Sequence, residues 1–207
     1  MHRNRARYAG NCRNCGIRTA RLHYLDGDET LTGHKEHEPM ETATYRIIGT
    51  IRSPFTDGDT TPIQSIFSEA EGAIEVAPGY ADGLEGLDGF SHIYLLYHFH
   101  RVNGFSLRQR PFADGSRERG IFAIRHCNRP NPIGISLVEV IAVEGNTVRV
   151  RGIDVLDGTP LLDIKPYVRQ FDHRDEVRSG WVDARRIEEV KVRSFSPKDL
   201  REYEESA

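Results

Sequence analysis

The stretch Ile135-Ser-Leu-Val-Glu-Val-Ile-Ala-Val143, Glu144-Gly145-Asn146, Thr147-Val-Arg-Val-Arg-Gly-Ile-Asp-Val-Leu156 has the pattern of a β-hairpin. Both arms are rich in β-branched residues, and a short Gly-Asn connection between such arms is typical of a hairpin turn. This stretch therefore predicts two adjacent antiparallel strands.

The second arm of the hairpin changes its alternation part-way. Val148 and Val150 share one phase, whereas the apolar residues after Gly152 share the other. An extra residue in one strand produces such a change and redirects the side chains beyond it. We expect a β-bulge at Gly152 that re-aims Asp154.

Outward from the hairpin, other short apolar segments are bounded by glycine, proline or polar residues. They predict strands at Tyr45–Ile51, Gly72–Val76, Phe90–His100 and Gly120–Ile124, and short helices at Tyr80–Leu87 and Pro197–Glu205. Phe90–His100 is apolar on both faces, as in a strand of a barrel wall or a central sheet. Many short strands with few helices predict a mainly β protein, an antiparallel β-barrel with a few short helices.

Composition narrows the class of protein. The chain has 207 residues, 38% of them hydrophobic, and a net charge of −3, which argues against binding nucleic acid or membranes by bulk charge. Apolar runs of membrane-spanning length and an apolar secretory signal are both absent from the sequence. Three cysteines do not make a disulfide framework, so we expect a cytoplasmic protein.

The first 40 residues differ from the rest. They are rich in arginine and histidine with little apolar periodicity, which predicts poor order. Cys12 and Cys15 have metal-ligand spacing, but a lone Cys-x-x-Cys pair is a weak signal and we expect no zinc site. We interpret residues 1–39 as a misassigned start, with translation beginning at Met40. The barrel domain is then expected at residues 41–185, and a tail with a short helix at residues 186–207.

A stiff polar loop precedes the hairpin. We call it the cradle, and its sequence is Arg125-His126-Cys127-Asn128-Arg129-Pro130-Asn131-Pro132-Ile133-Gly134. Its two prolines each fix their own φ and favour an extended backbone at the residue before them. The simplest alternative is a merely stiff strand connection, but the density of polar groups favours a ligand site. The polar groups of the cradle and the following segment are Arg125, Arg129, Asn131, Asp154, Asp157, Asp163, Lys165 and Tyr167. Guanidinium groups bind carboxylates and carboxylates face cations, so this set suits a zwitterion with a separate positive centre.

Familiar catalytic signatures are missing from the sequence. It has no Gly-x-Gly-x-x-Gly opening a helix, no phosphate-binding P-loop and no Gly-x-Ser-x-Gly elbow. His98 and His100 share one face of a strand, yet metal ligation needs more partners, so we expect no metal. Cys127 beside His126 is not favoured as a nucleophile, because adjacent side chains on an extended chain point apart.

An ordered set of segments resembles one known family. They are Ile48-Gly49-Thr50-Ile51-Arg52-Ser53-Pro54-Phe55, Leu87-Asp88-Gly89-Phe90-Ser91-His92, Phe99-His100, Gly120-Ile121-Phe122-Ala123, Arg129-Pro130-Asn131-Pro132-Ile133-Gly134, Asp157-Gly158-Thr159-Pro160 and Asp163-Ile164-Lys165-Pro166-Tyr167. Together they resemble the TrmO family, also called YaeB-like or TsaA-like, from about Tyr45 to Trp181. The match departs from the family at His126-Cys127-Asn128, where a small-small-aromatic triplet is more usual.

The resemblance implies a β-barrel methyltransferase that binds S-adenosylmethionine, acts as a homodimer and methylates N6 of threonylcarbamoyladenosine beside the anticodon of tRNA. By position it implies cofactor contacts at Gln64, Ser65, Ile66, Phe99, His100, Arg125, Ile135, Gly152, Ile153 and Asp154. The cradle side chains Arg129 and Asn131 are further candidates for the cofactor. Asp157, Lys165 and Tyr167 are candidates for orienting or deprotonating the target nitrogen.

Two other functions stay open at this point. One is a regulatory module that binds S-adenosylmethionine without catalysis, and the other is a small-molecule methyltransferase on the same barrel. A regulatory module would need the cradle but not Asp157, Lys165 and Tyr167, so the presence of these three residues favours an enzyme.

Overall fold

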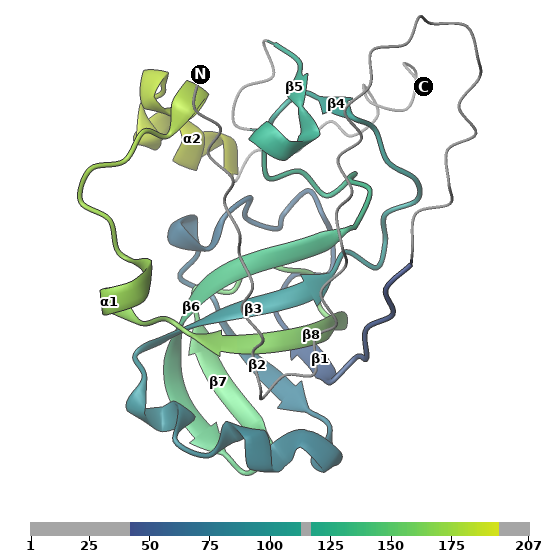
Figure 1. The fold of residues 1–207 in the computed structure, drawn as a ribbon, viewed down its shortest axis with the longest axis vertical. Helices are drawn as coiled ribbons and strands as arrows, with labels where there is room; N and C mark the ends of the chain where they lie inside the picture. Colours follow the sequence, from purple (N-terminus) through teal and green to yellow (C-terminus); the bar gives the residue numbers. More distant parts are fainter. Residues whose placement is uncertain (1–41, 113–116, 195–207) are drawn as a thin grey trace, which may run out of the picture. The chain divides into compact units, whose positions relative to one another are not determined.

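The computed structural model describes residues 42–112 and 117–194, and the described residues from Ala43 onward belong to one compact unit. Six strands form a closed antiparallel barrel in the order β1-β2-β7-β6-β3-β8 (Figure 1). Their bounds are β1 Gly49–Arg52, β2 Glu71–Val76, β3 His92–His98, β6 Ile133–Glu144, β7 Thr147–Arg151 and β8 Thr159–Pro166. The predicted mainly β barrel is confirmed.

The central hairpin is formed by β6 and β7, as predicted. Glu144 pairs with Thr147, and Gly145 at the turn has a φ of 62°, a conformation that glycine adopts at little cost. The predicted bulge at Gly152 is wrong. The register shift lies in β6 between Val140 and Ala142, while β7 ends at Arg151 and Gly152 turns the chain out of the strand with a φ of 87°.

The core fills the barrel interior with alternate residues of each strand. On β3, Ile93, Leu95 and Tyr97 are buried, whereas Tyr94 and Leu96 on the outer face are only partly buried. Thus β3 lies in the barrel wall but is fully apolar on one face only. The inner residues of the other strands complete the same cluster, notably Ile51, Ile74, Val148, Val150, Ile153 and Leu161.

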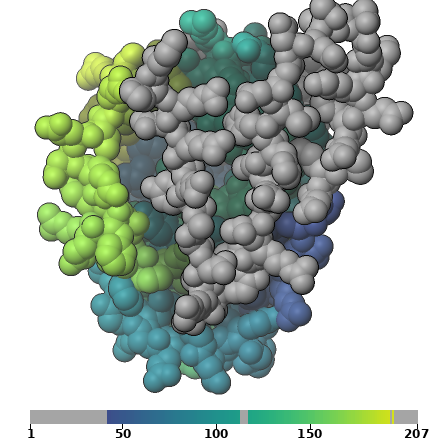
Figure 2. Space-filling model, in the orientation of Figure 1, coloured from purple at the N-terminus to yellow at the C-terminus, as the bar shows by residue number. Residues whose placement is uncertain are grey.

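Short 3-10 helices close one end of the barrel. Expected as one helix at Tyr80–Leu87, this region instead forms η2 (Pro78–Leu84) and η3 (Leu87–Gly89), separated at Gly86, which has a φ of 77°. Leu84 and Leu87 are buried against the core. In the space-filling view these segments form the teal surface at the lower edge (Figure 2).

Two strand predictions are wrong in extent. The expected strand Tyr45–Ile51 begins only at Gly49, because Tyr45 and Ile47 are exposed and the pairing of β1 with β2 starts at Gly49. The expected strand Gly120–Ile124 is a two-residue strand, β5 (Arg119–Gly120), followed by the 3-10 helix η4 (Ile121–Ala123). Strand β5 pairs with β4 (Arg108–Gln109) in a separate small sheet.

The C-terminal segment contains α1 (Arg169–Asp172), η5 (Gly180–Ala184) and α2 (Ile187–Ser194). Among the described residues, no helix has the length and apolar character needed to cross a membrane. The Cys12–Cys15 pair and the helix expected at Pro197–Glu205 lie outside the described residues.

Candidate functional site

The strand order brings most of the predicted site residues to one end of the barrel. We call this the loop end: β1, β3 and β7 finish there and β2, β6 and β8 begin there. The opposite end is the one closed by η2 and η3. Helix η1 (Ser65–Phe67), the cradle and the segment 152–157 all lie at the loop end.

Arg125 and Gln64 form the outer part of this site. The Arg125 guanidinium donates a hydrogen bond from Nη1 to Gln64 Oε1 at 2.7 Å. The C-terminal segment holds the backbone on both sides of this pair. Trp181 Nε1 donates to the Ala123 carbonyl at 2.9 Å, and Ile63 N donates to the hydroxyl of buried Ser194 at 2.9 Å.

A buried chain of hydroxyl groups leads from the barrel interior to Asp154. Ser136 Oγ donates a hydrogen bond to Asp154 Oδ1, and the Tyr97 hydroxyl lies 3.1 Å from Ser136 Oγ. Because Ser136 has a single hydroxyl proton and gives it to the carboxylate, Tyr97 must be the donor to Ser136. Both Tyr97 and Ser136 are almost fully buried. The chain of donors therefore aims at one carboxylate oxygen.

The environment of Asp154 makes its ionisation sensitive to pH. Burial raises the pKa of Asp154 to about 6, although the Ser136 hydroxyl, the backbone N–H of Ser65 and the charge of Arg125 each lower it. Burial and the nearby Asp154 charge raise the pKa of Tyr97, so this phenol stays protonated at neutral pH. Asp154 is a carboxylate at neutral pH that readily gains a proton in mild acid.

Gly152 and Ile153 fix the backbone that carries Asp154. The backbone of Gly152 has a positive φ of 87°, which is strained for any other residue. An added Cβ at this position would lie 3.6 Å from the Ser65 carbonyl oxygen. The N–H groups of both residues donate to the Ala70 carbonyl, and the Ile153 side chain lies in the core. The Ile153 side chain thus anchors the segment and does not face solvent.

The cradle is braced by its own side chains. Arg129 Nη1 donates to the carbonyl of Ile124 at 3.2 Å and of His126 at 3.4 Å. His126 is buried, stacks on Phe112 with ring centroids 4.6 Å apart, and accepts the Asn128 N–H at Nδ1. Burial, followed by the charge of Arg129, lowers the pKa of His126 to about 4, so this histidine is neutral.

The remaining cradle positions differ in exposure. Asn131 is exposed, and its carbonyl accepts the Ile133 N–H at 2.7 Å. Gly134 lies against the Tyr97 ring so closely that an added Cβ would stand 2.1 Å from Tyr97 Cε2. The last residue of the cradle is therefore packed on the first donor of the hydroxyl chain.

Three other predicted cofactor contacts lie on the rim or the outer wall of the barrel. The ring of Phe99 packs edge-on against that of Tyr97, with the ring centroids 5.3 Å apart. The Phe99 N–H donates to the Pro132 carbonyl at 2.8 Å. His100, the next residue, is exposed, and Ile135 is exposed on the outer face of β6.

The three residues predicted for catalysis do not meet within one chain. Asp157 accepts the Ser53 N–H at 3.1 Å at the loop end, whereas Lys165 pairs with Asp163 at 2.8 Å. Tyr167 lies near Tyr94, with ring centroids 6.0 Å apart. Asp157 and Tyr167 flank opposite ends of β8, and at about 3.3 Å per residue its seven steps span roughly 23 Å.

Comparison with known proteins identifies the family. A family profile described as the tRNA-methyltransferase O N-terminal domain matches residues 50–173, more than half of the chain. The chain belongs to the TrmO family. This confirms the resemblance drawn from the sequence motifs.

Individual relatives agree with this family assignment. A protein of Pyrococcus abyssi, named a probable S-adenosyl-L-methionine-binding protein, is 49% identical over 140 residues, which are 67% of this chain and 76% of that protein. The tRNA (adenine(37)-N6)-methyltransferase of Escherichia coli is 37% identical over 163 residues, 74% of this chain and 69% of the relative.

Solved structures of the TrmO family share the barrel. A crystal structure of TrmO is 37% identical and superposes with a TM-score of 0.60, covering 68% of this chain and 64% of the solved chain. TrmO from Pseudomonas aeruginosa gives a TM-score of 0.58 at 37% identity, with 68% and 63% coverage. This chain thus spans slightly less than two thirds of those solved chains.

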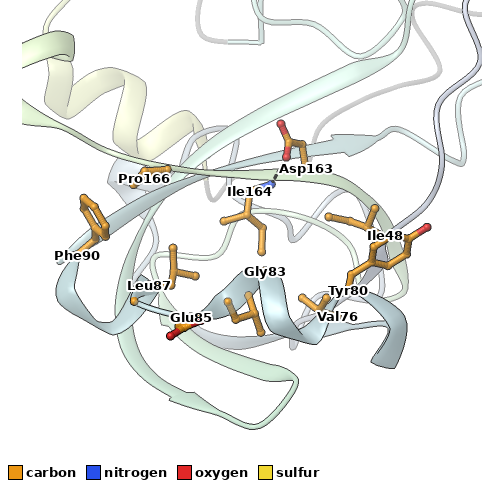
Figure 3. Close-up of a pocket in the computed structure, with 12 residues that line it drawn as sticks. Ile48, Val76, Tyr80, Gly83, Glu85, Leu87, Phe90, Asp163, Ile164 and Pro166 are labelled. Atoms are coloured by element: carbon orange, nitrogen blue, oxygen red, sulfur yellow. Dashed lines mark hydrogen bonds between the residues drawn. The ribbon is translucent and has the colours of Figure 1, made fainter. Parts of the chain in front are cut away.

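A pocket of about 430 Å³ lies at the opposite end of the TrmO-type barrel, between β8 and the short helices η2 and η3 (Figure 3). Ile164, Leu87 and Phe90 give it a largely apolar lining, with Glu85 and Asp163 at its border. Most of the polar residues that the sequence assigned to cofactor binding lie at the loop end instead. In the described part of the chain, no three His, Cys, Asp or Glu side chains are grouped as metal ligands.

Two residues important for the loop end were missed from the sequence. Ser136 and Tyr97 are buried donors that orient Asp154, and neither was a candidate. One signal was available: Ser136 occupies an inward-facing position of a strand whose other inward residue nearby, Val138, is apolar. A hydroxyl at such a position needs a partner inside the barrel.

Proposed function

We propose that this chain is an S-adenosylmethionine-dependent methyltransferase that modifies N6 of threonylcarbamoyladenosine beside the anticodon of tRNA. The observation that carries the proposal is that the loop end of a TrmO-family barrel holds a partly buried carboxylate, Asp154, within the electrostatic influence of Arg125, whose guanidinium is bonded to Gln64. The names of the relatives agree with this cofactor and this class of enzyme.

The groups at the loop end fit the chemistry of S-adenosylmethionine. The methionyl part of this molecule is a zwitterion, and its methyl group is carried by a sulfonium cation. Asp154, when ionised, offers a carboxylate to a cationic group, while Arg125 offers a guanidinium to the carboxylate. Gln64, already bonded to Arg125, fixes the guanidinium in place. When bound, S-adenosylmethionine supplies an electrophilic methyl group.

The protein's contribution would be chiefly positioning and electrostatics. The Tyr97–Ser136 chain holds Asp154, and the braced cradle holds Arg125 near it. Asp157, Lys165 and Tyr167 are proposed to orient or deprotonate the target nitrogen. Because Asp157 and Tyr167 flank opposite ends of β8, a site that uses both needs a second copy of the chain, and we include a homodimer in the proposal.

Transfer of a labelled methyl group from S-adenosylmethionine into bulk tRNA tests this function. We expect label in tRNA that already carries threonylcarbamoyladenosine, none in an unmodified transcript of the same tRNA, and an N6-methylated nucleoside after digestion. Cofactor binding without transfer would instead indicate a regulatory module. Cofactor consumption with a small molecule but not with tRNA would indicate the other methyltransferase function. A tRNA substrate would also place the protein in the cytoplasm.

A further inference from the structure

Large apolar side chains project into solvent around the Arg125–Gln64 pair. Phe122 on η4 is 78% exposed and lies three residues before Arg125, and Ile66 on η1 is also 78% exposed and lies two residues after Gln64. Phe105 is 60% exposed in the segment that leads to β4. Exposed apolar groups clustered beside a site indicate a surface that binds a partner.

Phe122 is held outward by a well-anchored backbone. Its neighbours Ile121 and Ile124 are buried, and Ile121 N donates to the Leu107 carbonyl at 3.0 Å. The next residue, Ala123, accepts a hydrogen bond from Trp181. The local structure therefore fixes the backbone that carries Phe122, and the exposed ring adds little to the packing of the core.

The same region concentrates positive charge. Residues 101–129 contain seven arginines and two acidic residues, in a chain whose net charge is −3. Arg119 lies over the Trp181 ring at 4.8 Å, and Arg108 pairs with Glu118 at 3.5 Å across the β4–β5 sheet. Figure 1 shows this sheet together with the coil of η4, apart from the barrel strands. Exposed aromatic rings among arginines are the pattern of surfaces that bind unpaired nucleic acid.

We propose that Phe122 stacks on an unpaired base next to the target adenosine, and that the exposed arginines Arg108, Arg110 and Arg117 contact the flanking phosphates. The inference rests on the proposed function and specifies how the RNA is held. A second copy of the chain fits this surface less well, because a symmetric contact would bring like arginine clusters together.

The test compares the affinity of Phe122→Ala and the wild-type protein for tRNA, measured by filter binding. We expect roughly tenfold weaker tRNA binding, in the range for loss of one base–aromatic stack, with unchanged affinity for S-adenosylmethionine by calorimetry. Phe122→Trp should bind tRNA like the wild type because it keeps an aromatic face. Tyr45→Ala, which removes a similarly exposed ring before β1, should also leave tRNA affinity unchanged.

Three results would overturn the inference. Unchanged tRNA affinity of Phe122→Ala, while the wild type methylates tRNA, would refute the stacking role and leave the proposed function standing. An equal loss in Tyr45→Ala would show that the effect is not local. A change in molar mass of Phe122→Ala by light scattering would make the surface a contact between copies. Failure of the wild type to methylate tRNA would be a separate outcome that refutes the proposed function itself.

Discussion

Replacing Asp154 by Asn should stabilise the protein while weakening its binding of S-adenosylmethionine. The carboxylate is partly buried at the end of the Tyr97–Ser136 chain, and its pKa is raised to about 6 by burial. An Asn side chain has nearly the same shape and can still accept the Ser136 hydrogen through its oxygen. It carries no charge, so the destabilising burial of charge disappears.

The size and sign of the effect follow from linkage between protonation and folding. The pKa rises from the ordinary 3.8 to about 6, and each pKa unit corresponds to 1.36 kcal/mol, so ionised Asp154 lowers the free energy of unfolding by about 2–3 kcal/mol. Well below pH 3.8 both the folded and the unfolded state hold the proton, and the penalty vanishes. Between the two pKa values the unfolded state ionises while the folded state stays protonated, so the penalty grows. Above pH 6 both states are ionised and the full penalty applies.

Urea unfolding of both proteins without ligand, between pH 4 and pH 8, measures this effect. We expect Asp154→Asn to be more stable by about 1–3 kcal/mol above pH 6, with the difference shrinking toward pH 4, and to bind S-adenosylmethionine at least tenfold more weakly. Asp157→Asn is the matched control, because Asp157 is more exposed and bonds the Ser53 N–H, and it should not be stabilised. If Asp154→Asn is equally or less stable at pH 8, the reasoning about buried charge is refuted.

Two further substitutions probe the rest of the site. Gly134→Ala should lower the free energy of unfolding by about 1–3 kcal/mol, because its Cβ would stand 2.1 Å from the buried Tyr97 ring; a change under about 0.5 kcal/mol in urea unfolding would contradict this packing. Tyr167→Phe should reduce kcat for tRNA methylation with little change in the calorimetric affinity for S-adenosylmethionine, and an unaltered kcat would exclude Tyr167 from the active site.

The strands whose periodicity matches their final pairing could be predicted from sequence. The β6–β7 hairpin is one, since its turn and both arms are contiguous in the chain. Gly120–Ile124 was predicted wrongly because its composition suits a strand. Its buried residues, Ile121 and Ile124, are three apart, which is the spacing of a 3-10 helix.

The site is less accessible to sequence reasoning, because its contacts join distant segments. Asp154 was a candidate, but its donors Ser136 and Tyr97 come from β6 and β3 and meet it only when the barrel closes. Arg129 illustrates the opposite problem. An arginine in a polar loop suggests a ligand-binding residue, yet the Arg129 guanidinium donates to carbonyls of its own loop. These bonds depend on the conformation of the loop, which the sequence pattern does not specify.

Titration of S-adenosylmethionine into wild-type protein and Arg125→Ala by calorimetry most directly tests whether the loop end is a cofactor site. Loss of a hydrogen bond to a charged group corresponds to about 1.5–3 kcal/mol, so we expect saturable binding to the wild type and at least roughly tenfold weaker binding to the variant. Absence of binding to the wild type at millimolar ligand, or equal affinity of the two proteins, would contradict the assignment.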